Sequence, residues 1–148
     1  MPINETATDR QREELALRKY EEYLRRTVGP VTVHRAPAGG LTACDAIIEI
    51  DSYLCFLEIK CRNVTREQYA TYMISQRKMQ NLQFIALRQT VGLLVHWTNC
   101  TGLYTITGRN LPIGVTIETG GRTDRKQKND TEPCWLIPID RFKIIEAS

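Results

Sequence analysis

The chain has 148 residues, of which 42% are hydrophobic and 25% are charged, and its formal net charge is +3. This length and composition are typical of a soluble globular protein, so we expect residues 1–148 to form a single domain with a buried core. No apolar run reaches the length of a membrane span and the polar N-terminus is unlike a secretory signal, so we expect a cytoplasmic protein with no membrane partner. The five cysteines lack metal-binding spacing and are expected to be reduced thiols.

The first expected element is a helix from Thr8 to Arg26. Leu17 and Leu24 belong to an apolar stripe with a helical period, and Gly29-Pro30 ends the element. Val31–Arg35 alternates between apolar and polar residues, which predicts a first strand.

A hairpin follows. Ala43–Ile50 and Tyr53–Cys61 both have the pattern of strands, and Asp51-Ser52 is expected to be the two-residue loop between them. Counting outward from this loop places Asp45 directly opposite Glu58. Both faces of the hairpin are largely apolar, so we expect the sheet to lie between two other layers.

The middle of the chain is expected to form a crossover connection. Thr65 and Gln68 have the spacing of a capping box, which predicts a long helix from there to about Arg88. Val91–Thr98 is a continuous apolar run and is expected to be a buried strand beside the hairpin.

Three further strands are expected in the C-terminal part: Leu103–Thr107, Ile113–Glu118 and Cys134–Ile139. Pro138 indicates that the last of these lies at a sheet edge. Trp135 is expected to be a core residue or an interface anchor, and it could serve a dimer contact.

Three charged residues on the hairpin predict a site. Glu58 and Lys60 are two positions apart in an apolar strand, so their side chains project on the same face. Asp45 and Glu58 lie close enough in the expected register to repel each other unless a cation lies between them. This combination predicts a divalent-metal site for phosphate chemistry.

The order helix, three strands, helix, strand, with Asp45 on one hairpin strand and Glu58-x-Lys60 on the next, resembles the PD-(D/E)XK nuclease superfamily. The likeness covers roughly residues 13–98, and Cys44 stands where the family motif has proline. The resemblance implies an α/β fold with a restriction-endonuclease-like core at about residues 8–98. That core is a mixed central sheet flanked by helices, to which residues 99–148 add a C-terminal strand extension and a basic loop.

The resemblance also implies a metal-dependent nuclease that hydrolyses DNA phosphodiester bonds and is selective for junctions or branched DNA. Mg²⁺, for which Mn²⁺ can substitute, is then held by Asp45, Glu58, the carbonyl of Ile59 and Glu13, with Glu14 as the other candidate on the first helix. The implied catalytic residues are Asp45, Glu58, Lys60 and Gln76. Relatives of this kind imply a homodimer, phage-encoded and active in the host cell.

Basic residues around the site are expected to bind the nucleic acid. They are Arg35, Arg62, Lys78, Arg122, Arg125, Lys126 and Lys128. Two other interpretations stay open: a catalytically inactive nucleic-acid-binding protein that retains the nuclease fold, and an unrelated mixed-sheet protein in which Glu58 and Lys60 form an ordinary ion pair.

Overall fold

The computed structural model describes residues 7–35, 44–119 and 132–147. Its two helices, two short 3₁₀ helices and nine strands follow the chain in this order: α1 (Ala7–Thr27), β1 (Val31–Arg35), β2 (Ala46–Ile50), β3 (Tyr53–Cys61), η1 (Arg66–Gln68), β4 (Thr71–Ser75), α2 (Gln76–Ala86), β5 (Thr90–His96), β6 (Cys100–Ile106), β7 (Thr116–Thr119), β8 (Pro133–Pro138), η3 (Ile139–Arg141) and β9 (Lys143–Ala147). In this part of the chain no helix has the length and apolarity that crossing a bilayer requires. The expected mixed α/β fold is confirmed.

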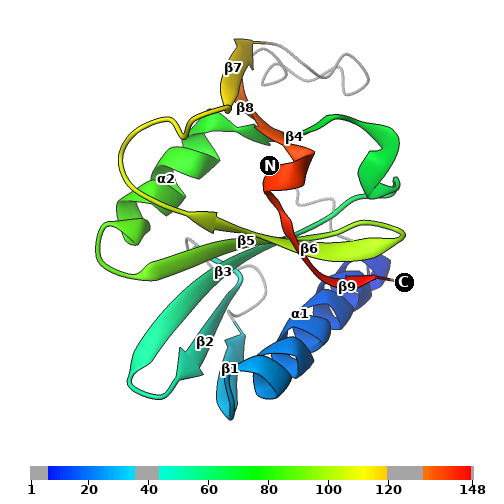
Figure 1. The fold of residues 1–148 in the computed structure, drawn as a ribbon, viewed down its shortest axis with the longest axis vertical. Helices are drawn as coiled ribbons and strands as arrows, with labels where there is room; N and C mark the ends of the chain where they lie inside the picture. Colours follow the sequence, from blue (N-terminus) through cyan, green and yellow to red (C-terminus); the bar gives the residue numbers. More distant parts are fainter. Residues whose placement is uncertain (1–6, 36–43, 120–131, 148) are drawn as a thin grey trace.

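A six-stranded mixed sheet with the order β1-β2-β3-β5-β6-β9 forms the centre of the molecule (Figure 1). β3 and β5 run parallel and are joined through α2, while the other neighbouring strands are antiparallel. A parallel pair needs such a crossover, so the predicted connection between the hairpin and the strand after it is confirmed.

Helix α1 covers one face of this sheet. Its apolar stripe, which includes Leu17 and Leu24, packs against Ile48, Leu57 and Ile59 in one buried cluster. These side chains alternate along β2 and β3, as the pleat of a strand requires.

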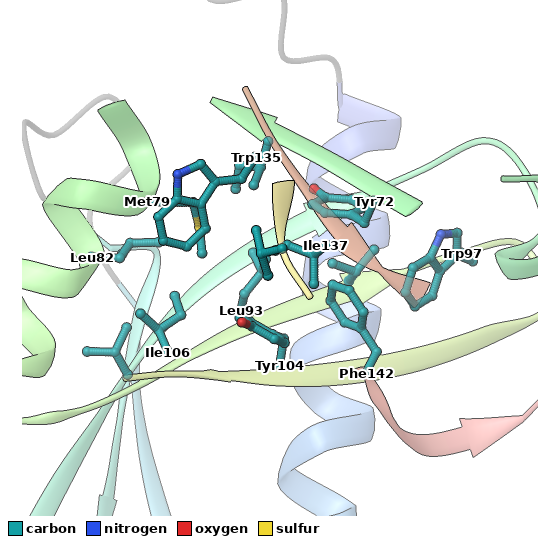
Figure 2. Close-up of a cluster of buried hydrophobic side chains, with 14 of the residues drawn as sticks. Tyr72, Met79, Leu82, Leu93, Trp97, Tyr104, Ile106, Trp135, Ile137 and Phe142 are labelled. Carbon is teal, nitrogen blue, oxygen red and sulfur yellow. The ribbon is translucent and has the colours of Figure 1, made fainter. Parts of the chain in front are cut away.

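The opposite face is covered by α2 and by a second, three-stranded sheet with the order β4-β8-β7. Figure 2 shows this core, in which aromatic rings of Tyr72, Trp97 and Phe142 pack against one another with centroids 5.3–6.4 Å apart. The sheet therefore lies between two layers, as expected, but on the hairpin only the face toward α1 is fully buried. On its other face Ile47, Leu54 and Phe56 are half-buried, and Phe56 packs against the second core.

The register of the hairpin agrees with the prediction. Ile50 pairs with Tyr53, and Ala46 pairs with Leu57 at the far end of the ladder. Asp51 has a φ of 50°, the left-handed conformation that a tight two-residue loop needs and that Asp tolerates better than most residues.

The prediction of one long helix after Thr65 was wrong. The side chain of Thr65 makes no capping hydrogen bond, and only a single 3₁₀ turn follows it. Residues 71–75 then form strand β4, because their alternating apolar side chains pair with β8 and fill the core. Ser75 is the residue that caps α2, where its Oγ accepts a hydrogen bond from the backbone N–H of Lys78 at 3.3 Å.

The prediction of an edge position for the Cys134–Ile139 strand was also wrong. β8 lies between β4 and β7, and Pro138 is accommodated because it is the last residue of the strand, opposite Thr71. Trp135 is 3% exposed and belongs to the core, so it is not available as a dimer anchor. β8 is not the final strand, because β9 follows it and pairs with β6.

The strand expected at Ile113–Glu118 begins only at Thr116. The five cysteines are free thiols, as expected. The basic loop Gly120–Asp130, with four of the expected nucleic-acid-binding residues, lies outside the described residues.

Candidate active site

Asp45 is fixed at the entrance of β2 by two hydrogen bonds to β3. Its backbone N–H donates to the carbonyl of Leu57 at 2.8 Å, and its carboxylate Oδ2 accepts from the backbone N–H of Ile59 at 2.8 Å. A hydrogen bond to a charged acceptor is among the stronger ones, and it directs this carboxylate toward β3 beside Glu58.

Glu58 and Lys60 project from the same face of β3. The side chain of Glu58 is only 4% exposed, and its Oε2 lies 3.5 Å from the Lys60 ammonium nitrogen. A second cation, the Lys78 ammonium, lies 3.1 Å from the other carboxylate oxygen, Oε1. Apart from this ammonium, the buried Oε1 has no hydrogen-bond partner among the described residues.

The electrostatic environment of Glu58 is unfavourable to its own charge. Burial raises the pKa of Glu58, and the neighbouring Asp45 carboxylate raises it further, while Lys60 and Lys78 lower it. The raising influences win, so the ionised carboxylate lies in a place where additional positive charge is stabilising.

Lys78 reaches Glu58 because of where α2 begins. It occupies the first turn of the helix, which is capped by Ser75 at the end of β4. The sequence predicted Lys78 as a contact for nucleic acid, and the structure adds that it is an ion-pair partner of the buried carboxylate.

Arg62 lies just beyond the end of β3, with its guanidinium carbon 4.6 Å from the centre of the Tyr72 ring. Its Nη1 also donates to the carbonyl of Cys61 at 3.2 Å. Burial raises the pKa of Tyr72 to about 12, so its ring is neutral and its face attracts the cation. Sequence reasoning missed this support because it placed Tyr72 in a helix; the alternation along residues 71–75 was the signal for the strand.

Arg35 connects α1 to the edge of the site. Its Nε lies 2.6 Å from Glu14 Oε1 and its Nη2 lies 3.8 Å from Glu13 Oε1, while its Nη1 donates to the carbonyl of Asp45 at 3.4 Å. Across the described ranges, no three His, Cys, Asp or Glu side chains come together as a metal cluster. The role of Glu13 as a metal ligand and that of Arg35 in nucleic-acid binding stay predictions.

The structure thus brings four of the expected residues together: Asp45, Glu58, Lys60 and Lys78. Gln76 is the first residue of α2, half-buried and two positions before Lys78, and its catalytic role stays a prediction. Arg122, Arg125, Lys126 and Lys128 lie outside the described residues.

Comparisons with known proteins identify the family of the chain. No curated protein sequence matches the chain. Among solved structures, the Holliday junction resolvase Hjc of the archaeal hyperthermophile Archaeoglobus fulgidus is similar over 66% of this chain and 74% of its own, with 12% sequence identity and a TM-score of 0.46. A family model described as "Phage putative PDDEXK endonuclease" matches residues 1–145, which is nearly the whole chain. The chain therefore belongs to this family of PD-(D/E)XK endonucleases.

Proposed function

We propose that the protein is a divalent-metal-dependent nuclease that hydrolyses phosphodiester bonds of DNA. The observation that carries the proposal is the buried Glu58 carboxylate, which lies beside Asp45 and between the ammonium groups of Lys60 and Lys78. Two adjacent carboxylates with two cations on one face can hold a hard metal ion and a phosphate group together.

The residues present fit a magnesium ion. Asp45, Glu58 and the carbonyl of Ile59 offer oxygen ligands, and a bound cation would offset the burial and the Asp45 charge that raise the pKa of Glu58. Mg²⁺ keeps several waters when proteins bind it, so two carboxylates and one carbonyl are a sufficient set. When bound, Mg²⁺ or Mn²⁺ supplies a more acidic water and polarises a phosphoryl oxygen.

The protein's own groups have separate tasks in this proposal. The hydrogen bond from Ile59 N–H holds the Asp45 carboxylate in one orientation. Lys60, whose ammonium is about one-third exposed, stabilises the negative charge that develops on the phosphoryl oxygens. Lys78 keeps Glu58 ionised by lowering its pKa and adds positive charge where the phosphate enters.

A cleavage assay on a panel of duplex, flap and four-way-junction DNA tests the proposal and the selectivity for branched substrates. Cutting is expected with Mg²⁺ or Mn²⁺ and not with EDTA. Asp45→Asn, Glu58→Gln and Lys60→Met are expected to lower the rate by roughly a hundredfold or more each. Glu49→Gln is the matched control, because Glu49 is a half-exposed carboxylate on the neighbouring strand that pairs with His34.

Two outcomes contradict the proposal. Cutting that survives all three substitutions excludes this site. Binding of DNA without cutting in any metal supports the inactive nucleic-acid-binding protein instead.

A further inference from the structure

The middle of the chain has an unusual charge distribution. The 50 residues from Gln68 to Ile117 contain no Asp or Glu, but they contain Arg77, Lys78, Arg88 and Arg109. These four cations exceed the net charge of +3 of the whole chain, so the remaining residues are slightly acidic taken together. A segment that lacks negative charge in this way favours contact with a polyanion where it is exposed.

Helix α2 has one side that is exposed to solvent. Its exposed side consists of Arg77, Gln80, Asn81, Phe84 and, just past the helix end, Arg88, which recur at helical spacing; we call these five residues the α2 face. Phe84 is 76% exposed, which is uncommon for an aromatic side chain in a soluble protein. The exposed arginines, amides and aromatic ring are residue types that bind nucleic acid.

The loop between β6 and β7 adds a further cation beside this helix. Figure 1 shows that loop curving past α2. Gln83, on the buried side of α2, donates through its amide nitrogen to the carbonyls of Thr107 and Asn110 at 3.4 and 2.9 Å. The exposed Arg109 is thereby held next to α2.

The arginines of this surface are exposed. Within the described residues, neither a hydrogen bond nor an ion pair engages the side chains of Arg77, Arg88 and Arg109, whereas Arg25 and Arg35 are bound to carboxylates of α1. Their positive charge is therefore free for a partner.

The α2 face is continuous with the candidate active site. Lys78, in the first turn of α2, lies 3.1 Å from Glu58, while its neighbour Arg77 is exposed. At ~1.5 Å per residue, the distance from Arg77 to Arg88 is about 16 Å along the helix axis. This corresponds to roughly five base pairs of duplex DNA at about 3.4 Å each.

We propose that the α2 face, together with Arg109, enters the major groove of duplex DNA beside the bond that is cut and reads bases there. The inference rests on the proposed function, because it takes DNA as the substrate. The side-chain amides of Gln80 and Asn81 are the groups that form bidentate hydrogen bonds with adenine, and Phe84 can contact the methyl group of thymine. The arginines bind the flanking phosphates and set the register.

The phosphate contacts are tested by binding in EDTA, where cutting plays no part. Fluorescence anisotropy with a mixed-sequence duplex gives the affinity as a function of KCl concentration. The double variant Arg77→Ala/Arg88→Ala is expected to reduce the slope of log K against log [KCl] by about 1.8, since each lost phosphate contact contributes ~0.9.

The matched control is Arg18→Ala/Arg26→Ala, which removes two exposed arginines from α1 on the opposite face of the sheet. It is expected to leave the slope unchanged. An equal effect of the two double variants, an unchanged slope in both, or no binding of duplex DNA by the wild type overturns the proposal.

Base reading is tested by selecting duplexes from a randomised library by binding in EDTA and sequencing them. The wild type is expected to enrich duplexes in which adenines lie within about five base pairs of one another. In Gln80→Ala/Asn81→Ala this enrichment is expected to be weaker by roughly tenfold or more. Gln11→Ala, at an exposed position of α1, is the control. No preference in the wild type, or the same preference in the double variant, overturns the assignment. A failure of the proposed function is distinguishable, because it appears in the cleavage assay and leaves both binding readouts intact.

Discussion

Glu58→Gln keeps the size and shape of a buried side chain and removes its charge. The wild-type carboxylate is 4% exposed, and its two cationic partners, Lys60 and Lys78, are 36% and 33% exposed. The substitution therefore separates the energetic cost of burying the carboxylate from the catalytic use that we propose for it.

The two terms can be compared from the structure. Ion pairs with partners that water reaches stabilise by about 0–1 kcal/mol each. Removing a carboxylate from water costs several kcal/mol, and the raised pKa of Glu58 means that the fold disfavours its charged form more than water does. We expect Glu58→Gln to increase the free energy of unfolding by roughly 1–3 kcal/mol at pH 8 in EDTA. The midpoint temperature should rise by about 2–4 °C for each kcal/mol.

The difference should depend on pH with a definite sign. The pKa of Glu58 is higher in the folded than in the unfolded protein. Glu58 therefore makes its full contribution to the free energy of unfolding below the ordinary glutamate pKa of about 4.3, and this contribution is lost as the pH rises through the raised value. Urea unfolding in EDTA should therefore show a small difference between the two proteins near pH 4 and a larger one at pH 8. Glu49→Gln, half-exposed, should change stability by less than about 0.5 kcal/mol throughout.

A divalent metal should remove or reverse this difference in stability. An ion at a hundred times its dissociation constant stabilises the folded wild type by about 2.7 kcal/mol, and Glu58→Gln lacks one of the proposed ligands. The reasoning is refuted if Glu58→Gln is less stable than the wild type at pH 8 in EDTA, or if Mn²⁺ stabilises the two proteins equally.

Three further predictions concern Asp45, Lys78 and Trp135. Asp45→Asn retains an acceptor for Ile59 N–H, so its free energy of unfolding in urea should lie within about 1 kcal/mol of the wild-type value. Asp45→Ala loses the hydrogen bond and should lower this free energy by roughly 1–3 kcal/mol. Equal losses in the two variants would show that this hydrogen bond does not stabilise the fold. Lys78→Ala removes a cation that lowers the pKa of Glu58, so the acid limb of the cleavage pH profile should move to higher pH, and an unmoved limb would contradict the coupling. Trp135→Ala should destabilise the protein by about 3–5 kcal/mol in urea without changing the sedimentation behaviour of the fraction that stays folded, and a change of oligomeric state would restore the interface role that its burial argues against.

The local parts of the fold and of the site were accessible from the sequence. The hairpin register followed from a two-residue loop at Asp51-Ser52 and from apolar alternation, both of which act over a few residues. Because the register was right, the juxtaposition of Asp45 with the Glu58 strand was right as well.

The parts that failed depend on contacts between distant segments. Residues 71–75 contain a strand pattern, but their conformation is decided by pairing with β8 and by the core around Trp135. The same second sheet makes β8 a central strand, which Pro138 alone argued against. Local propensity is a weak guide where such tertiary pairing competes with it.

The pairing of β4 with β8 has a consequence for the timing of synthesis. Asp45, Glu58 and Lys60 leave the ribosome early, but the start of the helix that carries Lys78 is anchored by Ser75 opposite Cys134. The start of α2, and with it the position of Lys78 beside Glu58, is therefore fixed only after β8, in the last fifth of the chain, has been translated.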